Sequence, residues 1–163
     1  MKDLVNKVRQ WGLDRGIVYT GEEGQDKAEL MEAQARYTLK ETAELLDAYA
    51  DRDITALKDA VGDVLVTLIV GASSDTPILT DITEWMEGWI FDEAPKYDDT
   101  GAEYGLQAIV SSVLRLVRRD TRETMDYVYP ILTLNVVLEG VYKEFGTPLS
   151  LKYCLEHAYN EIK

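Results

Sequence analysis

Cysteine, histidine and long apolar runs are nearly absent from this chain of 163 residues. The single cysteine, Cys154, excludes an internal disulfide framework and is typical of a reducing compartment. Nothing in the sequence pairs Cys154 with the single histidine, His157, as a zinc or nucleophilic site, so we interpret both as structural. No stretch is long and apolar enough to cross a bilayer, and the charged first segment lacks the apolar region of a secretory signal. These absences predict a cytoplasmic protein without a membrane span.

Basic residues are also scarce: 17 Lys and Arg stand against 30 Asp and Glu, which gives a formal net charge of −13. Such a charge repels phosphate backbones, which argues against binding to a nucleic acid polymer or to an anionic membrane. A single nucleotide is still compatible with this charge, provided that a cation bridges the two negative partners. The apolar content of 46% excludes wholesale disorder, and the length suits a single domain, residues 1–163.

Proline is rare, and no segment shows the period of two that is typical of a strand. Apolar residues recur at helical spacing, which predicts helices over residues 2–15, 27–50, 54–71, 78–91, 106–117, 121–145 and 148–163. We expect each of the four prolines to mark a helix boundary, or a kink at Pro130. Asp53 is the expected N-cap of the third helix, and Thr147 that of the last, with Pro148 at its first position. The predicted fold class is an all-α helical bundle.

Four acidic residues fall on facing sides of the second and third predicted helices. Glu41 and Glu44 are three residues apart, and Asp59 and Asp63 are four apart, so each pair shares a helix face. The short break between the helices makes them antiparallel neighbours. Counted outward from the break, Glu44 lies level with Asp59, and Glu41 lies level with Asp63. If both faces point inward, the four carboxylates meet in one patch on a helical hairpin.

Asp63 is the only charge in the run AVGDVLVTLIVGA, residues 60–72. An ionised carboxylate buried in such a run is strongly unfavourable unless it is neutralised. Hard cations such as Mg²⁺ or Mn²⁺ prefer carboxylate oxygens. The sequence therefore predicts a metal site made by the four-carboxylate patch. In the alternative interpretation, Glu41 and Glu44 are solvated surface acids beside Lys40.

The segment LKETAELLDAYADRDITALKDAVGDVLVTLI, residues 39–69, resembles the MazG-like all-α nucleoside triphosphate pyrophosphohydrolases. That family carries Glu-x-x-Glu on one helix and an acidic pair ending in Asp, followed by an apolar run, on the next. Glu41 and Glu44 match the first element, and Gly62-Asp63-Val64 matches the centre of the second. The segments LVNKVRQWGLDRG (4–16) and CLEHAYNEIK (154–163) are similar to the first helix of the family and to the tail of its small phage or bacterial members.

The resemblance implies a Mg²⁺-dependent reaction, with Mn²⁺ as an alternative, that cleaves a nucleoside triphosphate into the monophosphate and pyrophosphate. It implies that Glu41, Glu44 and Asp63 hold the metal and that Asp59 assists. It also implies that one glutamate, Glu41 by preference over Glu44, takes a proton from the attacking water. The protein would then act in the cytoplasm of a bacterium or a phage-infected host, as a homodimer or homotetramer in which a partner completes the site.

The same resemblance places Asn160 and Lys163 near the nucleotide and lets Trp11 stack on its base. Each of these residues also has a plain interpretation, an ordinary polar helix end for Asn160 and Lys163 and a core position for Trp11. Residues 73–130 have no counterpart in the smallest members and are interpreted as a helical insertion.

Two positions depart from the family pattern. Lys40 precedes Glu41 where the family often has a second glutamate, and Ala60 stands where the acidic pair usually begins, with Asp59 one residue earlier. These departures leave room for a second hypothesis, a catalytically altered nucleotide-binding or protein-interaction module on the same fold. A third is a structural helical protein without a metal.

Two further clusters are expected to have no chemical role. Arg115, Arg118, Arg119 and Arg122 form the one basic cluster. A solvated helix face is the preferred interpretation, ahead of phosphate binding or contact with an acidic subunit. In the predicted helix 78–91, we expect Ile82, Trp85, Met86 and Trp89 to share one side, with the two tryptophans in packing or at an interface. Residues 94–101 are expected to form a loop.

Overall fold

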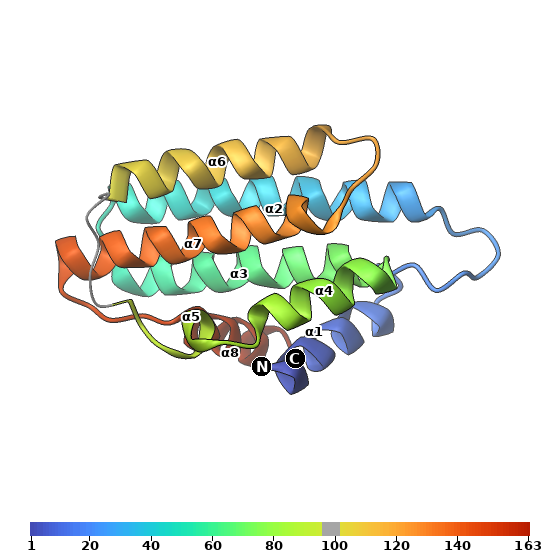
Figure 1. The fold of residues 1–163 in the computed structure, drawn as a ribbon, viewed down its shortest axis with the longest axis horizontal. Helices are drawn as coiled ribbons and strands as arrows, with labels where there is room; N and C mark the ends of the chain where they lie inside the picture. The colour runs from blue at the N-terminus through green and yellow to red at the C-terminus, as the bar shows by residue number, and fades with distance from the viewer. Residues whose placement is uncertain (96–101) are drawn as a thin grey trace.

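The computed structural model describes residues 1–95 and 102–163, and no strand occurs among them. The helices are α1 (Lys2–Asp14), α2 (Lys27–Ala50), α3 (Ile54–Ser73), α4 (Thr76–Met86), α5 (Trp89–Asp92), α6 (Ala102–Arg118), α7 (Thr124–Phe145) and α8 (Leu151–Ile162) (Figure 1). The predicted all-α class is therefore confirmed. Within the described ranges, no helix combines the length and the apolar character needed to cross a membrane.

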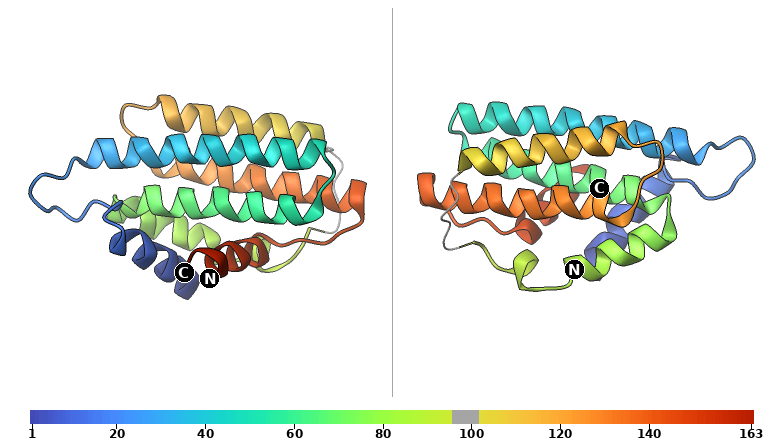
Figure 2. Two further views of the ribbon diagram at one scale, coloured as in Figure 1. Left: turned by 180° about the vertical axis from the view of Figure 1, so that it is seen from behind. Right: turned by 45° about the horizontal axis from the view of Figure 1, so that its top comes forward.

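The four long helices form one bundle of two antiparallel hairpins, α2 with α3 and α6 with α7. α2 packs beside α6, and α3 packs beside α7. The shorter helices α1, α4 and α8 cover the outer side of α3 (Figure 2). α3 thus lies between two layers, which explains why Val61, Leu65 and Leu68 are completely buried. A helix that is covered on both sides must be apolar on nearly all of its faces, which explains the apolar run around Asp63.

A glycine sets the distance between α3 and α8. A Cβ atom at Gly62 would overlap the backbone carbonyl oxygen of Cys154 and would lie 2.7 Å from the Cβ of Ala158. Only glycine allows α8 to approach α3 this closely. The contact encloses Cys154 completely, and this burial raises the pKa of its thiol to about 12. The thiol is therefore protonated and unreactive at neutral pH.

Local signals predict several helix ends correctly. α2 has the expected bounds, and Asp53 caps α3 by accepting a hydrogen bond from the Ala56 N–H at 3.1 Å. The expected start of the last helix is wrong, because Ser150 and not Thr147 is the N-cap, accepting from the Tyr153 N–H at 3.0 Å. Serine is the stronger N-cap residue, and the later start buries Leu151.

Pro130 lies inside α7, as the predicted helix over residues 121–145 requires, and does not mark a helix boundary. A proline in a helix interior costs about 3 kcal/mol. Here the helix continues because the residues on either side of the proline, from Tyr127 to Val141, supply a buried apolar face that offsets this cost.

The predicted helix 78–91 is divided in two, because α4 ends at Met86 and α5 begins at Trp89. The backbone N–H of Lys2 donates to the Glu87 carboxylate at 3.1 Å, which ties the start of α1 to this break. Ile82 and Met86 are buried as expected, but Trp85 is 52% exposed, so the expected common side is wrong. The side chain of Trp89 lies outside the described residues, as does most of the expected loop 94–101.

The arginine cluster is a structural brace for the turn between α6 and α7. The guanidinium groups of Arg115 and Arg119 each lie 3.4 Å from the carboxylate of Asp126, which is only 3% exposed. Arg122 donates to the backbone carbonyl of Leu116 at 3.0 Å. The expected solvated face is therefore incomplete: Arg115 and Arg119 stay exposed but also pair with a buried acid from the next helix, and Arg122 binds backbone carbonyls instead.

We expect Asp126→Ala to lower the free energy of unfolding by about 2 kcal/mol. The substitution removes the acceptor of the Glu123 N–H at 2.8 Å and leaves two arginines without their partner. Urea unfolding measures the loss, with Asp120→Ala as an exposed control in the same turn. Equal stability of the two variants would contradict the structural role of Asp126.

Candidate metal centre

The hairpin of α2 and α3 brings three of the four predicted acids together. One carboxylate oxygen each from Glu41, Glu44 and Asp63 lies within 4.8 Å of the other two. We call this group the carboxylate trio. Glu44 is exposed and the other two are half-buried, so the group is open to solvent on one side and shielded on the other. Its donor atoms are all oxygens, which suits a hard divalent cation.

The electrostatics of the carboxylate trio favour a bound cation. Burial raises the pKa of Glu41 to about 7, helped by the charge of Glu44, a hydrogen bond with Glu44 and the charge of Asp63, while Lys40 acts in the opposite direction. Burial also raises the pKa of Asp63 to about 6, helped by the charges of Asp59, Glu44 and Glu161. Among the described residues, no lysine or arginine forms an ion pair with the trio. In the part of the chain that the structure describes, the mutual repulsion of these acids is therefore offset only by the more distant charge of Lys40 and by the hydrogen bond between Glu41 and Glu44.

Asp59 is placed differently from the expected four-carboxylate patch. Its Oδ1 lies 3.4 Å from Nε2 of His157, and Oε1 of Glu161 lies 3.3 Å from the same nitrogen. We call Asp59, His157 and Glu161 the His157 cluster. The close approach of α8 at Gly62 brings these side chains to Asp59. His157 therefore has partners that the sequence analysis did not foresee, because they come from a distant segment of the chain.

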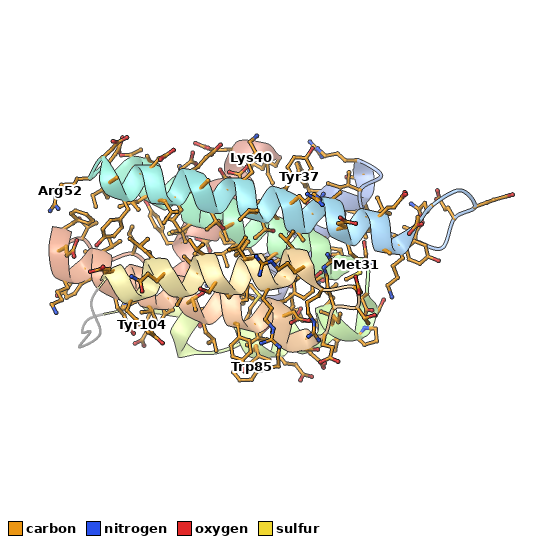
Figure 3. All side chains as sticks on the ribbon, turned by 90° about the horizontal axis from the view of Figure 1, so that it is seen from above. Met31, Tyr37, Lys40, Arg52, Trp85 and Tyr104 are labelled. Atoms are coloured by element: carbon orange, nitrogen blue, oxygen red, sulfur yellow. The ribbon has the colours of Figure 1, made fainter. Side chains whose placement is uncertain are left out.

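A cleft of about 420 Å³ adjoins the carboxylate trio, and Glu41 and Asp63 form part of its wall. Trp11 and Tyr37 supply aromatic surface, and Figure 3 shows Tyr37 on the edge of α2 that faces away from α6. Trp11 is held in place, because its indole N–H donates to the Ile162 carbonyl at 3.0 Å. The cleft therefore joins an apolar surface to an acidic one.

Gln34 also lines this cleft and was missed by the sequence analysis. Its side chain is buried at 5% exposure, yet its amide makes no hydrogen bond to any residue that the structure describes. Neither amide atom of Gln34 belongs to the buried polar atoms that lack a partner among the described residues, so the amide is accessible from the cleft and can bind solvent or a ligand there. The signal was present in the sequence: the helical line through Glu41 and Tyr37 continues back to Gln34.

Asn160 and Lys163 lie on another side of α8. They line a separate cavity of about 410 Å³ together with Lys7 and Lys152. Within one chain, the structure therefore does not bring these two predicted substrate contacts to the cleft beside the carboxylate trio, whereas it does bring Trp11 there.

In metal-free buffer, we expect stability to decrease as the pH rises from about 4 to about 8. Glu41 and Asp63 have folded-state pKa values of about 7 and about 6, above those of unfolded acids, so the folded state binds more protons in this range. Because both groups are partly exposed, the expected loss is only about 1 kcal/mol. Urea unfolding across this range measures it. Glu41→Gln should flatten the profile, and an unchanged profile in that variant would contradict the assignment.

Comparison of this chain with protein-family models, with curated proteins and with solved structures found no match.

Proposed function

We propose that this protein is a Mg²⁺-dependent nucleotide pyrophosphohydrolase that cleaves a ribo- or deoxyribonucleoside triphosphate into the monophosphate and pyrophosphate. The proposal rests on one observation, that an aromatic surface and an acidic surface meet in the same cleft. Glu41 and Asp63 of the carboxylate trio line the same cleft as Trp11, Tyr37 and Gln34. A nucleotide has the matching form, because its base is flat and its phosphates bind cations.

The residues of the trio suit the metal that the proposal requires. Their donors are oxygens, burial and neighbouring acids raise the pKa values of Glu41 and Asp63, and no lysine or arginine in the described part of the chain forms an ion pair with them. When bound, Mg²⁺ would neutralise phosphate charge and acidify a water molecule. Glu41, Glu44 and Asp63 would hold it. Glu41 is our candidate for the group that takes the proton from water, since it lines the cleft that would hold the nucleotide.

The cleft walls would bind the nucleoside. Trp11 and Tyr37 offer ring faces on which a base can stack, and the amide of Gln34 offers a donor and an acceptor to its edge. Thr67 also lines the cleft, but its hydroxyl already donates to the Val64 carbonyl at 2.9 Å. The amide of Gln34 thus has free hydrogen-bonding capacity at this place.

The phosphate contacts expected from Asn160 and Lys163 would come from a partner subunit. Within one chain, Asn160 and Lys163 line a different cavity. Glu44 of the trio is exposed, so this side of the site is open to a second subunit. The proposal therefore includes a homodimer or homotetramer, whose mass in solution is measured by light scattering.

One observation favours a second candidate, a nucleotide-binding module without turnover. Asp59 lies beside His157 and so does not complete the trio in place of the acid missing at Ala60. Three ligands can hold a cation without giving the geometry that turnover demands.

The deciding experiment is pyrophosphate release from a panel of ribo- and deoxyribonucleoside triphosphates, with Mg²⁺, with Mn²⁺ and with chelator. Release that depends on the metal and stops with chelator supports the enzyme. Nucleotide binding without release supports the module. If the protein binds neither Mg²⁺ nor Mn²⁺ in a titration, both candidates fail and a structural role is left.

A further inference from the structure

We propose that Asp59, His157 and Glu161 form a second metal site, which takes a divalent transition-metal ion of the Zn²⁺ type. The site would join α3 to α8 and shares no ligand with the carboxylate trio, although the charges of Asp59 and Glu161 reach Asp63. It does not depend on the proposed hydrolase activity. An imidazole nitrogen with two carboxylate oxygens is a donor set suited to Zn²⁺, whereas the oxygen-only trio suits Mg²⁺.

The distances within the His157 cluster fit ligands that surround an ion. Nε2 of His157 lies 3.4 Å from Oδ1 of Asp59 and 3.3 Å from Oε1 of Glu161, and neither contact has the geometry of a hydrogen bond. Ligand atoms bound tetrahedrally at about 2.0–2.1 Å from Zn²⁺ stand about 3.3–3.4 Å from one another. The three ligand atoms all lie within 4.8 Å of each other, so one ion can reach them together.

An orphaned oxygen gives an independent indication of a ligand. Oδ1 of Asp59 is shielded from solvent and accepts no hydrogen bond from any described residue, although it faces His157. A shielded carboxylate oxygen without a partner is unfavourable, and a cation would satisfy it. The cluster as a whole is accessible, since the side chain of Asp59 is 42% exposed and that of Glu161 is 56% exposed. An ion can therefore enter and keep a water molecule as fourth ligand.

The backbone holds these ligands in position. His157 and Glu161 are four residues apart on α8 and so share a face, and Asp59 comes from α3. The two helices are held close at Gly62. Two carboxylates with a neutral imidazole carry a charge of −2, which a divalent ion balances. The competing interpretation is a protonated His157 paired with both acids and no metal.

Titration of the full-length chain with Zn²⁺, and with Co²⁺ followed by visible absorption, tests the site. With excess Mg²⁺ present to occupy the carboxylate trio, we expect about one Zn²⁺ per chain to bind, with affinity kept in Asp63→Asn and reduced at least about tenfold in His157→Gln and in Glu161→Gln. Zn²⁺ should raise the melting temperature of the parent protein but not that of either variant. Glu156→Gln, an exposed acid on the same helix, is the matched control and should bind like the parent.

Either of two results would overturn the site: no Zn²⁺ binding by the parent, or binding that Asp63→Asn removes while His157→Gln and Glu161→Gln leave it intact. If His157→Gln fails to fold, Glu161→Gln decides alone, because its side chain is exposed and not part of the core. Since Zn²⁺ binding is read without nucleotide, failure here is distinguishable from failure of the proposed hydrolase.

Discussion

Asp63→Asn should lower pyrophosphate release at least about 100-fold while the metal-free protein stays folded, with its stability at pH 8 unchanged or increased. The two effects have one cause. Burial and neighbouring negative charges raise the pKa of Asp63 to about 6, so its ionised form is unfavourable in the folded protein above that pH. Asparagine keeps the shape of the side chain and removes the charge. It relieves the repulsion but gives up a metal ligand.

Release assays with saturating Mg²⁺ and urea unfolding in chelator at pH 8 measure the two effects. Asp47→Asn is the matched control, since it removes one exposed acid from α2 one turn beyond Glu44. It should keep both the activity and the stability of the parent protein to within about 0.5 kcal/mol. Full turnover in Asp63→Asn would refute the metal centre. Marked unfolding of this variant in chelator would show that the carboxylate has a structural role instead.

Gly62→Ala should destabilise the protein by about 3 kcal/mol, although alanine is normally the better helix residue by about 1 kcal/mol. The added Cβ would overlap the Cys154 carbonyl oxygen and lie 2.7 Å from the Cβ of Ala158. Neither neighbour is the flexible end of a side chain, so relief requires α8 to move as a unit. This movement would separate His157 from Asp59 and disturb the hydrogen bond from Trp11 to Ile162.

Urea unfolding gives the loss, and Zn²⁺ titration shows whether the His157 cluster has come apart. Gly88→Ala is the control, because a Cβ there has no neighbour within 4 Å among the described atoms. It should be close to neutral. If Gly62→Ala were as stable as the parent protein, the contact between α3 and α8 would be looser than the structure has it, and the placement of His157 would be in doubt.

Much of the candidate site could be predicted because its geometry is local. Glu41 and Glu44 share a face through the helical repeat, and a short break returns the chain so that Asp63 lies beside them. The position of Asp59 could not be predicted in the same way. It is one turn from Asp63, but the approach of α8 at Gly62 decides which neighbour its carboxylate meets.

The same division holds for the fold. A pattern of apolar residues and the N-cap Asp53 are properties of neighbouring residues, and they predict helices and some of their ends. The pairing of Arg115 and Arg119 with Asp126 depends on how α6 packs against α7, as does the continuation of α7 through Pro130. Packing against another helix can outweigh a local preference of about 3 kcal/mol.

By itself, the sequence determined the helical class, the antiparallel hairpin and the gathering of three acids beside an apolar run, since these follow from periodicity and short connections. Only the tertiary structure decided that Trp11 and Gln34 line a cleft with those acids, that Asn160 and Lys163 do not, and that His157 meets Asp59. The reason is that helix packing joins residues far apart in the chain, at distances set by contacts such as the one at Gly62, which periodicity does not encode.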